Sequence, residues 1–461
     1  MNRIILTFSF FFVCFFHLAQ YSTGHTTITF NDPARTGGFG SGGGPGRQIQ
    51  TELYYPSPLS GENTPISQGQ FPLITFGHGF AMSWDAYQNI WEHYVPLGYI
   101  VAFVRTEGSL IPSPSHQDFA LDMAIVTQKI QALNFNSTSL FEAHLNGKSI
   151  AMGHSMGGGS AVLAAQNNPL FDGYVGLAPA ETNPSAIAAC PNILCPSIIF
   201  SGSSDGVTPP SQHHRPMYDA IVSGCKSYVS ITGGAHCYFA NTNFNCDFGE
   251  STTSSGISIS RIQQQQKTYS ILDPWLEYIC KQSCNGLVAF HNGLNATTGT
   301  VNETNCPNTI ESATIFYDGQ STFYTIDQGI EFQWFNFGSP IENSNNDTLI
   351  ISSGDELEIS LSIITEWGCA MSDAISVSSN IEQNDFFDLI IQQENLVLMI
   401  NAQENMNGKC SILNLNGSLI SEASLIKGES KLMVNQLTQG LYLLFIETEK
   451  HSQLKRIYLH N

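Results

Sequence analysis

Charge, and positive charge above all, is scarce in this sequence. Lys and Arg together number 17 among 461 residues, against 38 Asp and Glu, so the formal net charge is −21. Nucleic acids and anionic membranes bind proteins through clusters of basic side chains. The composition therefore argues against both as partners.

Long apolar runs are also missing after residue 20, so we expect no transmembrane segment. Residues 1–20 themselves place Arg3 ahead of a short apolar run at 4–16, the pattern of a cleaved signal peptide. Cys14 lies inside that run and leaves a lipoprotein anchor as an alternative. We expect an exported protein.

Metal-binding motifs are lacking too: the sequence has no C-x-x-C pair and no H-E-x-x-H, so we predict no metal site. Ten cysteines follow the signal peptide, and in an oxidising compartment they predict disulfides. The candidates are Cys190 with Cys195, Cys237 with Cys246, and Cys280 and Cys284, which pair with each other or with cysteines elsewhere.

Apolar strands alternate with helical segments between residues 48 and 285. Strands are predicted at 50–55, 71–76, 99–104, 148–153, 174–177, 197–200 and 227–231, and helices at 84–94, 117–133, 161–166, 216–222 and 269–280. Such alternation predicts a mostly parallel, doubly wound α/β sheet covered by helices on both faces. The Gly-rich residues 21–47 ahead of it are interpreted as a lead-in, either draped on the domain or a flexible linker.

The segment Lys148–Ser160 contains the pattern G-x-S-x-G at Gly153, Ser155 and Gly157. The pattern follows a predicted strand and precedes a predicted helix, which is the setting of a nucleophile elbow with the serine at the apex of a sharp turn. A helix beginning there offers unpaired backbone N–H groups to an oxyanion, with that of Met156 best placed.

Three further features lie at the ends of predicted strands, where reactive groups gather in such sheets. The Gly-rich turn at 77–80 places the Phe80 N–H as a second oxyanion donor. Asp205 follows one strand and His236 the last. The chain order Ser155, Asp205, His236 is that of an α/β-hydrolase triad, and it predicts nucleophile, orienting carboxylate and base.

On these motifs the domain resembles the polyester-hydrolase, cutinase, chlorophyllase-like and dienelactone-hydrolase-like group of α/β-hydrolases. The resemblance rests on G-H-G-F at 77–80, G-H-S-M-G-G at 153–158, the Asp205 turn and G-G-A-H at 233–236. It implies ester hydrolysis through an acyl-enzyme. The implied substrate contacts are Phe80, Met156, Trp84 and Glu181.

Two departures from this group bear on the substrate. Polyester-degrading members usually carry a Trp after the strand that follows the elbow, whereas residues 178–183 here contain no aromatic. A long polar insert at 237–266, with three Phe residues, either forms one rim of the cleft or is loop filler.

The sequence beyond residue 285 changes to short alternating strands. Residues 286–384 resemble Ig-like or PKD-like modules of secreted Bacteroidetes proteins, with Cys306 and Cys369 as a guessed disulfide. Residues 385–461 resemble the type IX secretion C-terminal sorting domain, through I-L-N-L-N-G at 412–417 and Q-L-T-Q-G-L-Y-L at 436–443. An ordinary terminal β domain is the alternative.

These features together predict a secreted serine carboxylic-ester hydrolase that needs no cofactor and acts as a monomer. The resemblance favours polyester or cutin-like substrates. Acetyl or feruloyl esters of plant polysaccharide, lipids, and amide bonds are alternatives within the same mechanism. An inert binding or adhesion protein with a hydrolase fold is the alternative from another class. The expected partners are the ester substrate and the type IX secretion machinery.

Overall fold

The computed structural model describes most of the chain in two compact units. The described residues are 21–318, 321–341, 344–351, 357–365, 368–377, 392–394, 397–402, 408–414, 419–425, 428–433, 437, 440–448 and 452–459. The first unit ends at Val377, and the second comprises the strands that follow it. The predicted signal peptide, residues 1–20, lies outside the described residues.

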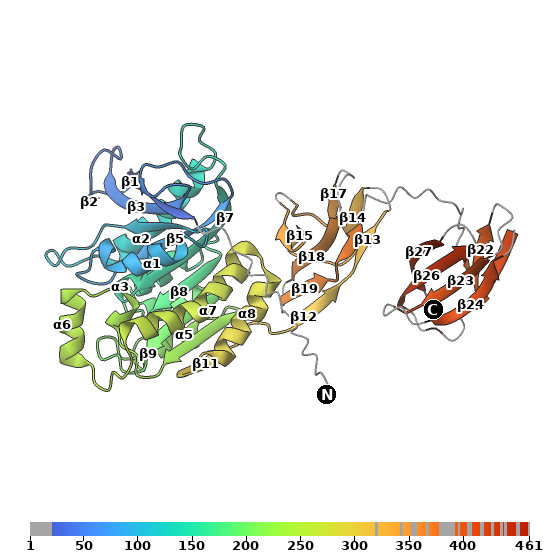
Figure 1. Cartoon of the computed structure of the whole chain (residues 1–461). Helices are drawn as coiled ribbons and strands as arrows, with labels where there is room; N and C mark the ends of the chain where they lie inside the picture. Colours follow the sequence, from blue (N-terminus) through green and yellow to red (C-terminus); the bar gives the residue numbers. More distant parts are fainter. Residues whose placement is uncertain are drawn as a thin grey trace, which may run out of the picture. The chain divides into compact units, whose positions relative to one another are not determined.

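An eleven-stranded mixed sheet forms the centre of the first unit (Figure 1). Its order is β11-β10-β9-β8-β7-β5-β6-β3-β1-β4, with β2 paired to β3. The strands are β1 (Ser22–Asp32), β2 (Gly38–Phe39), β3 (Arg47–Ser57), β4 (Gly61–Glu62), β5 (Phe71–Gly77), β6 (Ile100–Val104), β7 (Leu145–His154), β8 (Gly173–Leu177), β9 (Ser197–Gly202), β10 (Lys226–Ile231) and β11 (Thr300–Thr304). Strands β6, β5, β7, β8, β9 and β10 are parallel, which confirms the predicted α/β class.

The interpretation of residues 21–47 as a lead-in or linker is wrong. All eleven residues of β1 pair with β3 in the antiparallel direction, and Phe30 is buried in the core. The Gly-rich loop begins only after this strand. Because the whole segment was judged by those glycines, the alternation of buried positions within Ser22–Asp32 was overlooked. At the other end the sheet continues past residue 285, because β11 pairs with β10.

Helices cover both faces of the sheet. They are η1 (Trp84–Tyr87), α1 (Gln88–Tyr94), α2 (His116–Leu133), α3 (Met156–Ala165), α4 (Ala186–Ala189), η2 (Cys190–Asn192), α5 (His214–Ala220), η3 (Cys237–Phe239), α6 (Phe244–Thr253), α7 (Arg261–Lys281) and α8 (Cys284–Ala296). Successive strand residues point to opposite faces: Ile74 belongs to the core cluster that contains Trp275 of α7, and Leu73 to the one that contains Phe119 of α2. None of the described helices is long and apolar enough to cross a membrane.

The remaining described strands form smaller β sheets. In the first unit, β12 (Ile310–Ala313), β15 (Glu331–Asn336), β16 (Ser339–Pro340), β18 (Leu357–Thr365), β19 (Gly368–Ser372) and β20 (Ile375–Val377) form one sheet, and β13 (Ile315–Tyr317), β14 (Thr322–Thr325) and β17 (Thr348–Ile350) form another. Fully buried Trp334 lies in their core.

The second unit also consists of two sheets. One contains β21 (Gln392–Glu394), β22 (Val397–Ala402) and β25 (Gly428–Met433), and the other contains β23 (Gly408–Leu413), β24 (Leu419–Leu425), β26 (Gly440–Thr448) and β27 (Ser452–Leu459).

The disulfides differ from most of the predicted pairs. The Cys237–Cys246 bridge is present, as expected, but the others are Cys225–Cys306 and Cys284–Cys369. The predicted pair Cys190–Cys195 and the guessed pair Cys306–Cys369 are wrong, and Cys190, Cys195 and Cys280 are free thiols. Of the two alternatives left open for Cys284, the one with a partner elsewhere is correct. The bridges that were missed span 81 and 85 residues, so the fold, and not local spacing, brings their sulfurs together.

Candidate active site

Ser155 lies at the sharp turn between β7 and α3. Its backbone has φ 56° and ψ −123°, a conformation that L-residues rarely adopt, and the residue is 8% exposed. A Cβ at position 157 would lie 2.1 Å from the carbonyl oxygen of Gly77, and one at position 153 would lie 2.3 Å from that of Gly157. Only glycine fits at these two positions, so the G-x-S-x-G spacing follows from the close approach of the elbow to β5.

Asp205 and His236 come together at the ends of β9 and β10. His236 Nδ1 lies 2.8 Å from Asp205 Oδ2, and both residues are at least 95% buried. Asp205 Oδ1 accepts the N–H groups of Val207 and Thr208. Burial would raise the pKa of Asp205, but the charge and hydrogen bond of His236 outweigh it and hold the pKa below its usual value. The carboxylate is therefore ionised and fixes the imidazole.

A second histidine supports the same carboxylate through Thr208. The Thr208 hydroxyl lies 2.9 Å from Asp205 Oδ2 and 3.0 Å from His214 Nε2. Because an ionised carboxylate only accepts, the hydroxyl proton goes to Asp205 and the Thr208 oxygen accepts from His214. His214 Nδ1 then accepts from Ser201 Oγ at 2.8 Å. This pattern requires a neutral His214, and burial lowers its pKa to about 3.

Ser201, His214 and Asp205 are thus a second serine, histidine and carboxylate set beside the first. Ser201 belongs to β9 and is fully buried, and His214 is fully buried on α5. No substrate reaches a hydroxyl that is enclosed in the sheet. The pair therefore orients Asp205 and is not a nucleophile with its base.

His154, the residue before Ser155, connects the elbow to two other loops. Its Nε2 lies 3.0 Å from the carbonyl oxygen of His236, and its Nδ1 lies 2.9 Å from the hydroxyl of Tyr87. That hydroxyl accepts the N–H of Gly79 in the 77–80 turn at 2.8 Å. Burial, with the nearby charge of His236, holds the pKa of His154 well below its ordinary value. His154 stays neutral, as this bonding pattern requires.

The remaining predicted site residues have different surroundings. Met156 is buried and begins α3, where the first N–H groups have no intrahelical partner. Phe80 is half exposed, at 49%. Trp84 lines a hollow described below, whereas the Glu181 carboxylate accepts the N–H of Ile187 and lines neither hollow.

Helix α6, inside the insert predicted as rim or filler, bonds to all three loops of the site. Asn245 donates to the carbonyl oxygen of Ala81 at 2.8 Å. The buried Glu250 carboxylate accepts the N–H groups of His236 and Cys237 at 3.0 and 2.6 Å. Just past the helix, Ser254 Oγ accepts the N–H of Gly206, next to Asp205. No sequence pattern indicated these contacts, because their partners lie far apart along the chain.

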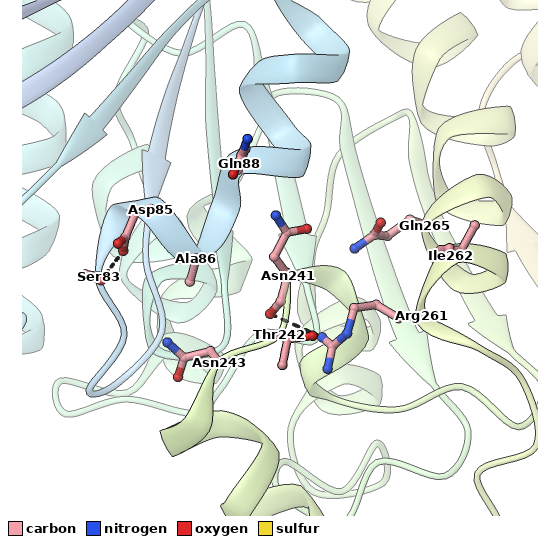
Figure 2. Close-up of a pocket in the computed structure, with 10 residues that line it drawn as sticks. All are labelled: Ser83, Asp85, Ala86, Gln88, Asn241, Thr242, Asn243, Arg261, Ile262 and Gln265. Carbon is pink, nitrogen blue, oxygen red and sulfur yellow. Dashed lines mark hydrogen bonds between the residues drawn. The ribbon is translucent and has the colours of Figure 1, made fainter.

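Two hollows adjoin η1 and share Ser83 and Asn243. One, of about 530 Å³, is lined by amide and charged side chains. Figure 2 shows Asp85 and Gln88 on one side of it and Arg261 and Gln265 of α7 on the other. The second hollow, of about 720 Å³, holds Trp84 and Phe39 beside the residues that follow Phe80. No cluster of three or more potential metal ligands occurs among the described residues.

Comparisons with known proteins identify two parts of the chain. A model of the PET hydrolase-like family matches residues 19–262, more than half of the sequence, and a model of the secretion system C-terminal sorting domain matches residues 394–460. The predicted sorting domain is thereby confirmed, and it directs export across the outer membrane to the medium or the cell surface.

The curated relatives are distant. A bis(hydroxyethyl) terephthalate hydrolase of Streptomyces coelicolor is 23% identical over 187 residues, which cover 40% of this chain and 54% of that protein. Cutinase est1 of Thermobifida alba is 24% identical over 221 residues, 48% of this chain and 66% of that protein. These two matches span about half to two thirds of each relative. With the elbow and the parallel sheet, the family match leads to one conclusion: the chain belongs to the PET hydrolase-like family of α/β-hydrolases.

Proposed function

We propose that the protein is an exported serine esterase that cleaves carboxylic esters of polyester or cutin-like polymers. The observation that carries the proposal is the buried Asp205–His236 hydrogen bond of 2.8 Å, which lies beside the elbow because His154 is hydrogen-bonded to the carbonyl oxygen of His236. Asp205 receives the Nδ1 proton, and no described residue is hydrogen-bonded to His236 Nε2. That nitrogen is therefore the one available to take a proton.

In the proposed reaction Ser155 Oγ attacks the ester carbonyl while His236 Nε2 takes its proton. Asp205 holds the tautomer and stabilises the imidazolium that forms. The N–H groups of Met156 and Phe80 stabilise the oxyanion. His236 then protonates the leaving alcohol, and a water molecule activated by the same nitrogen releases the acid from the acyl-enzyme.

An apolar rim supports a polymeric, apolar substrate. Phe80, Val207, Phe244 and Phe248 are between 36% and 82% exposed. Phe80 and Phe244 are the sequence neighbours of Ala81 and Asn245, which are hydrogen-bonded to each other. Val207 follows Gly206, whose N–H is bonded to Ser254. Exposed apolar groups gathered around a site mark an interaction surface. Cutinase and bis(hydroxyethyl) terephthalate hydrolase are the names of the relatives.

The hollow in Figure 2 favours a second substrate class, acyl esters of polysaccharide. Gln88, Asn241, Asn243 and Gln265 line it. Amides both donate and accept hydrogen bonds, as sugar hydroxyl groups do.

The test is turnover of the full-length protein against p-nitrophenyl esters, an amorphous aromatic polyester film and acetylated xylan. We expect release of acid from the film, and losses of at least about 10⁴-fold in kcat for Ser155→Ala and Asp205→Asn. Ser137→Ala, at an exposed turn residue, serves as the matched control. Turnover of xylan alone would assign the second class, and undiminished turnover by Ser155→Ala would sink the catalytic proposal.

A further inference from the structure

The larger hollow, of about 720 Å³, is lined by residues from five separate places along the chain. Four of these places lie within residues 38–39, 78–84, 105–114 and 243–245, and Arg47 adds a fifth position, so the hollow adjoins the proposed oxyanion turn. Its size suits a small organic group. The inference drawn from it rests on the proposed function, because it concerns the substrate of that site.

Arg105 presents unused hydrogen-bond donors to this hollow. Its guanidinium carbon lies 5.1 Å from the ring centroid of Phe39 and 5.9 Å from that of Trp84. Its Nη1 donates to Glu52, and among the described residues its guanidinium has no other hydrogen-bond partner. The Nε and Nη2 donors therefore remain available, and the side chain is 28% exposed.

The other charges of the hollow are already paired. Arg47 Nη2 lies 2.5 Å from Glu107 and 2.8 Å from the buried Asp122. The second oxygen of Glu107 accepts the N–H of Ser115. Arg47 Nη1 also has no hydrogen-bond partner among the described residues, but its side chain is only 6% exposed. Arg105 is therefore the arginine whose spare donors can reach a ligand, and it lies beside two aromatic rings.

We propose that this hollow is a subsite for an arylcarboxyl unit of the substrate. The ring packs against Trp84 and Phe39, and the carboxyl-derived oxygen accepts from Arg105. Because Ala81 and Met82 line the hollow directly after Phe80, its occupant is the chain unit next to the bond that is cleaved.

The experiment measures binding without turnover. Full-length Ser155→Ala protein is titrated calorimetrically with bis(2-hydroxyethyl) terephthalate and bis(2-hydroxyethyl) adipate. We expect saturable binding of the aromatic diester, at least about fivefold weaker binding of the aliphatic diester, and about tenfold weaker binding after Arg105→Gln.

Phe39→Ala is the second variant, because a half-exposed side chain can be removed without unfolding the protein. Arg215→Gln and Phe135→Ala, both outside the hollow, are the matched controls. Unchanged affinity in Arg105→Gln and Phe39→Ala, or equal affinity for the adipate, would overturn the subsite. Chromatography of the titrated sample separates the two failures: hydrolysis of the diester by Ser155→Ala would overturn the proposed function, whereas intact diester bound no better than the adipate would overturn the subsite.

Discussion

The nucleophile elbow and helix α6 meet at the same loops but are held in place in different ways. Every residue of α3 is buried, and the turn before it is set by glycines that touch neighbouring backbone. In α6 the buried residue is Glu250, while Phe244 and Phe248 face solvent. Local sterics fix the elbow, whereas α6 depends on long-range hydrogen bonds and a disulfide. Substitutions that separate these two causes test the comparison.

The largest effect is expected for Gly157→Ala. A Cβ there would lie 2.1 Å from the backbone oxygen of Gly77, and both Gly157 in α3 and Gly77 at the end of β5 are buried. We expect a loss of at least about 4 kcal/mol in the free energy of unfolding, or no folded protein. Urea unfolding followed by tryptophan fluorescence measures it, and a stability within 1 kcal/mol of the parent would refute the steric account.

A smaller effect is expected when the Cys237–Cys246 bridge is removed by Cys237→Ala with Cys246→Ala. The bridge closes a short loop, so its loss costs about 2–3 kcal/mol. Because Cys237 follows His236, ester turnover should fall together with the melting temperature. Removing the free thiol by Cys195→Ala is the control. Full activity in the double variant would show that α6 does not hold the His236 loop.

The pH dependence of stability is expected to come from the elbow side of the site, where His154 and His214 are buried and neutral. Helix α6 contains no histidine. His214 has a pKa of about 3 in the folded protein, below the ordinary value of 6.5, so protons favour the unfolded chain. His214 alone should lower the free energy of unfolding by up to about 1.4 kcal/mol per pH unit as the pH drops from 6.5 toward 3, and His154, whose pKa is also lowered, should add to this slope. Denaturant titrations at pH 7, 6 and 5 measure the slope. His214→Asn should remove the share of His214, and Phe135→Ala, at an exposed site, is the control.

The smallest effect, and one of opposite sign, is expected for Gly249→Ala in the middle of α6. Nothing lies within 4 Å of a Cβ at this position. Alanine should therefore stabilise the helix by about 0.5–1 kcal/mol. Destabilisation by this change would mean that α6 is packed as tightly as the elbow, and the comparison would fail.

The same contrast explains what could be predicted from the sequence. The G-x-S-x-G elbow and the strand ends at Asp205 and His236 are local patterns, and the structure brings Asp205 and His236 into contact. Strand β1 was missed because a Gly-rich loop follows it at once.

Other features depend on partners far away in the sequence. Glu250 stands in a polar insert without periodicity, and its role appears only once the fold places His236 beside it. The bridge between Cys225 and Cys306 forms because β11 returns to the edge of the sheet, which no spacing indicates. Thr208 could have been found, since an aspartate in a turn accepts the N–H groups of the residues two and three positions later, which places Thr208 beside the carboxylate.

The most direct test of the account is covalent labelling of the active protein with a fluorophosphonate, followed by peptide mass spectrometry. The account predicts one phosphonylated residue, Ser155, with loss of ester turnover in proportion to labelling and no label in Ser155→Ala. Labelling of Ser201, or complete loss of turnover with Ser155 unmodified, would contradict it.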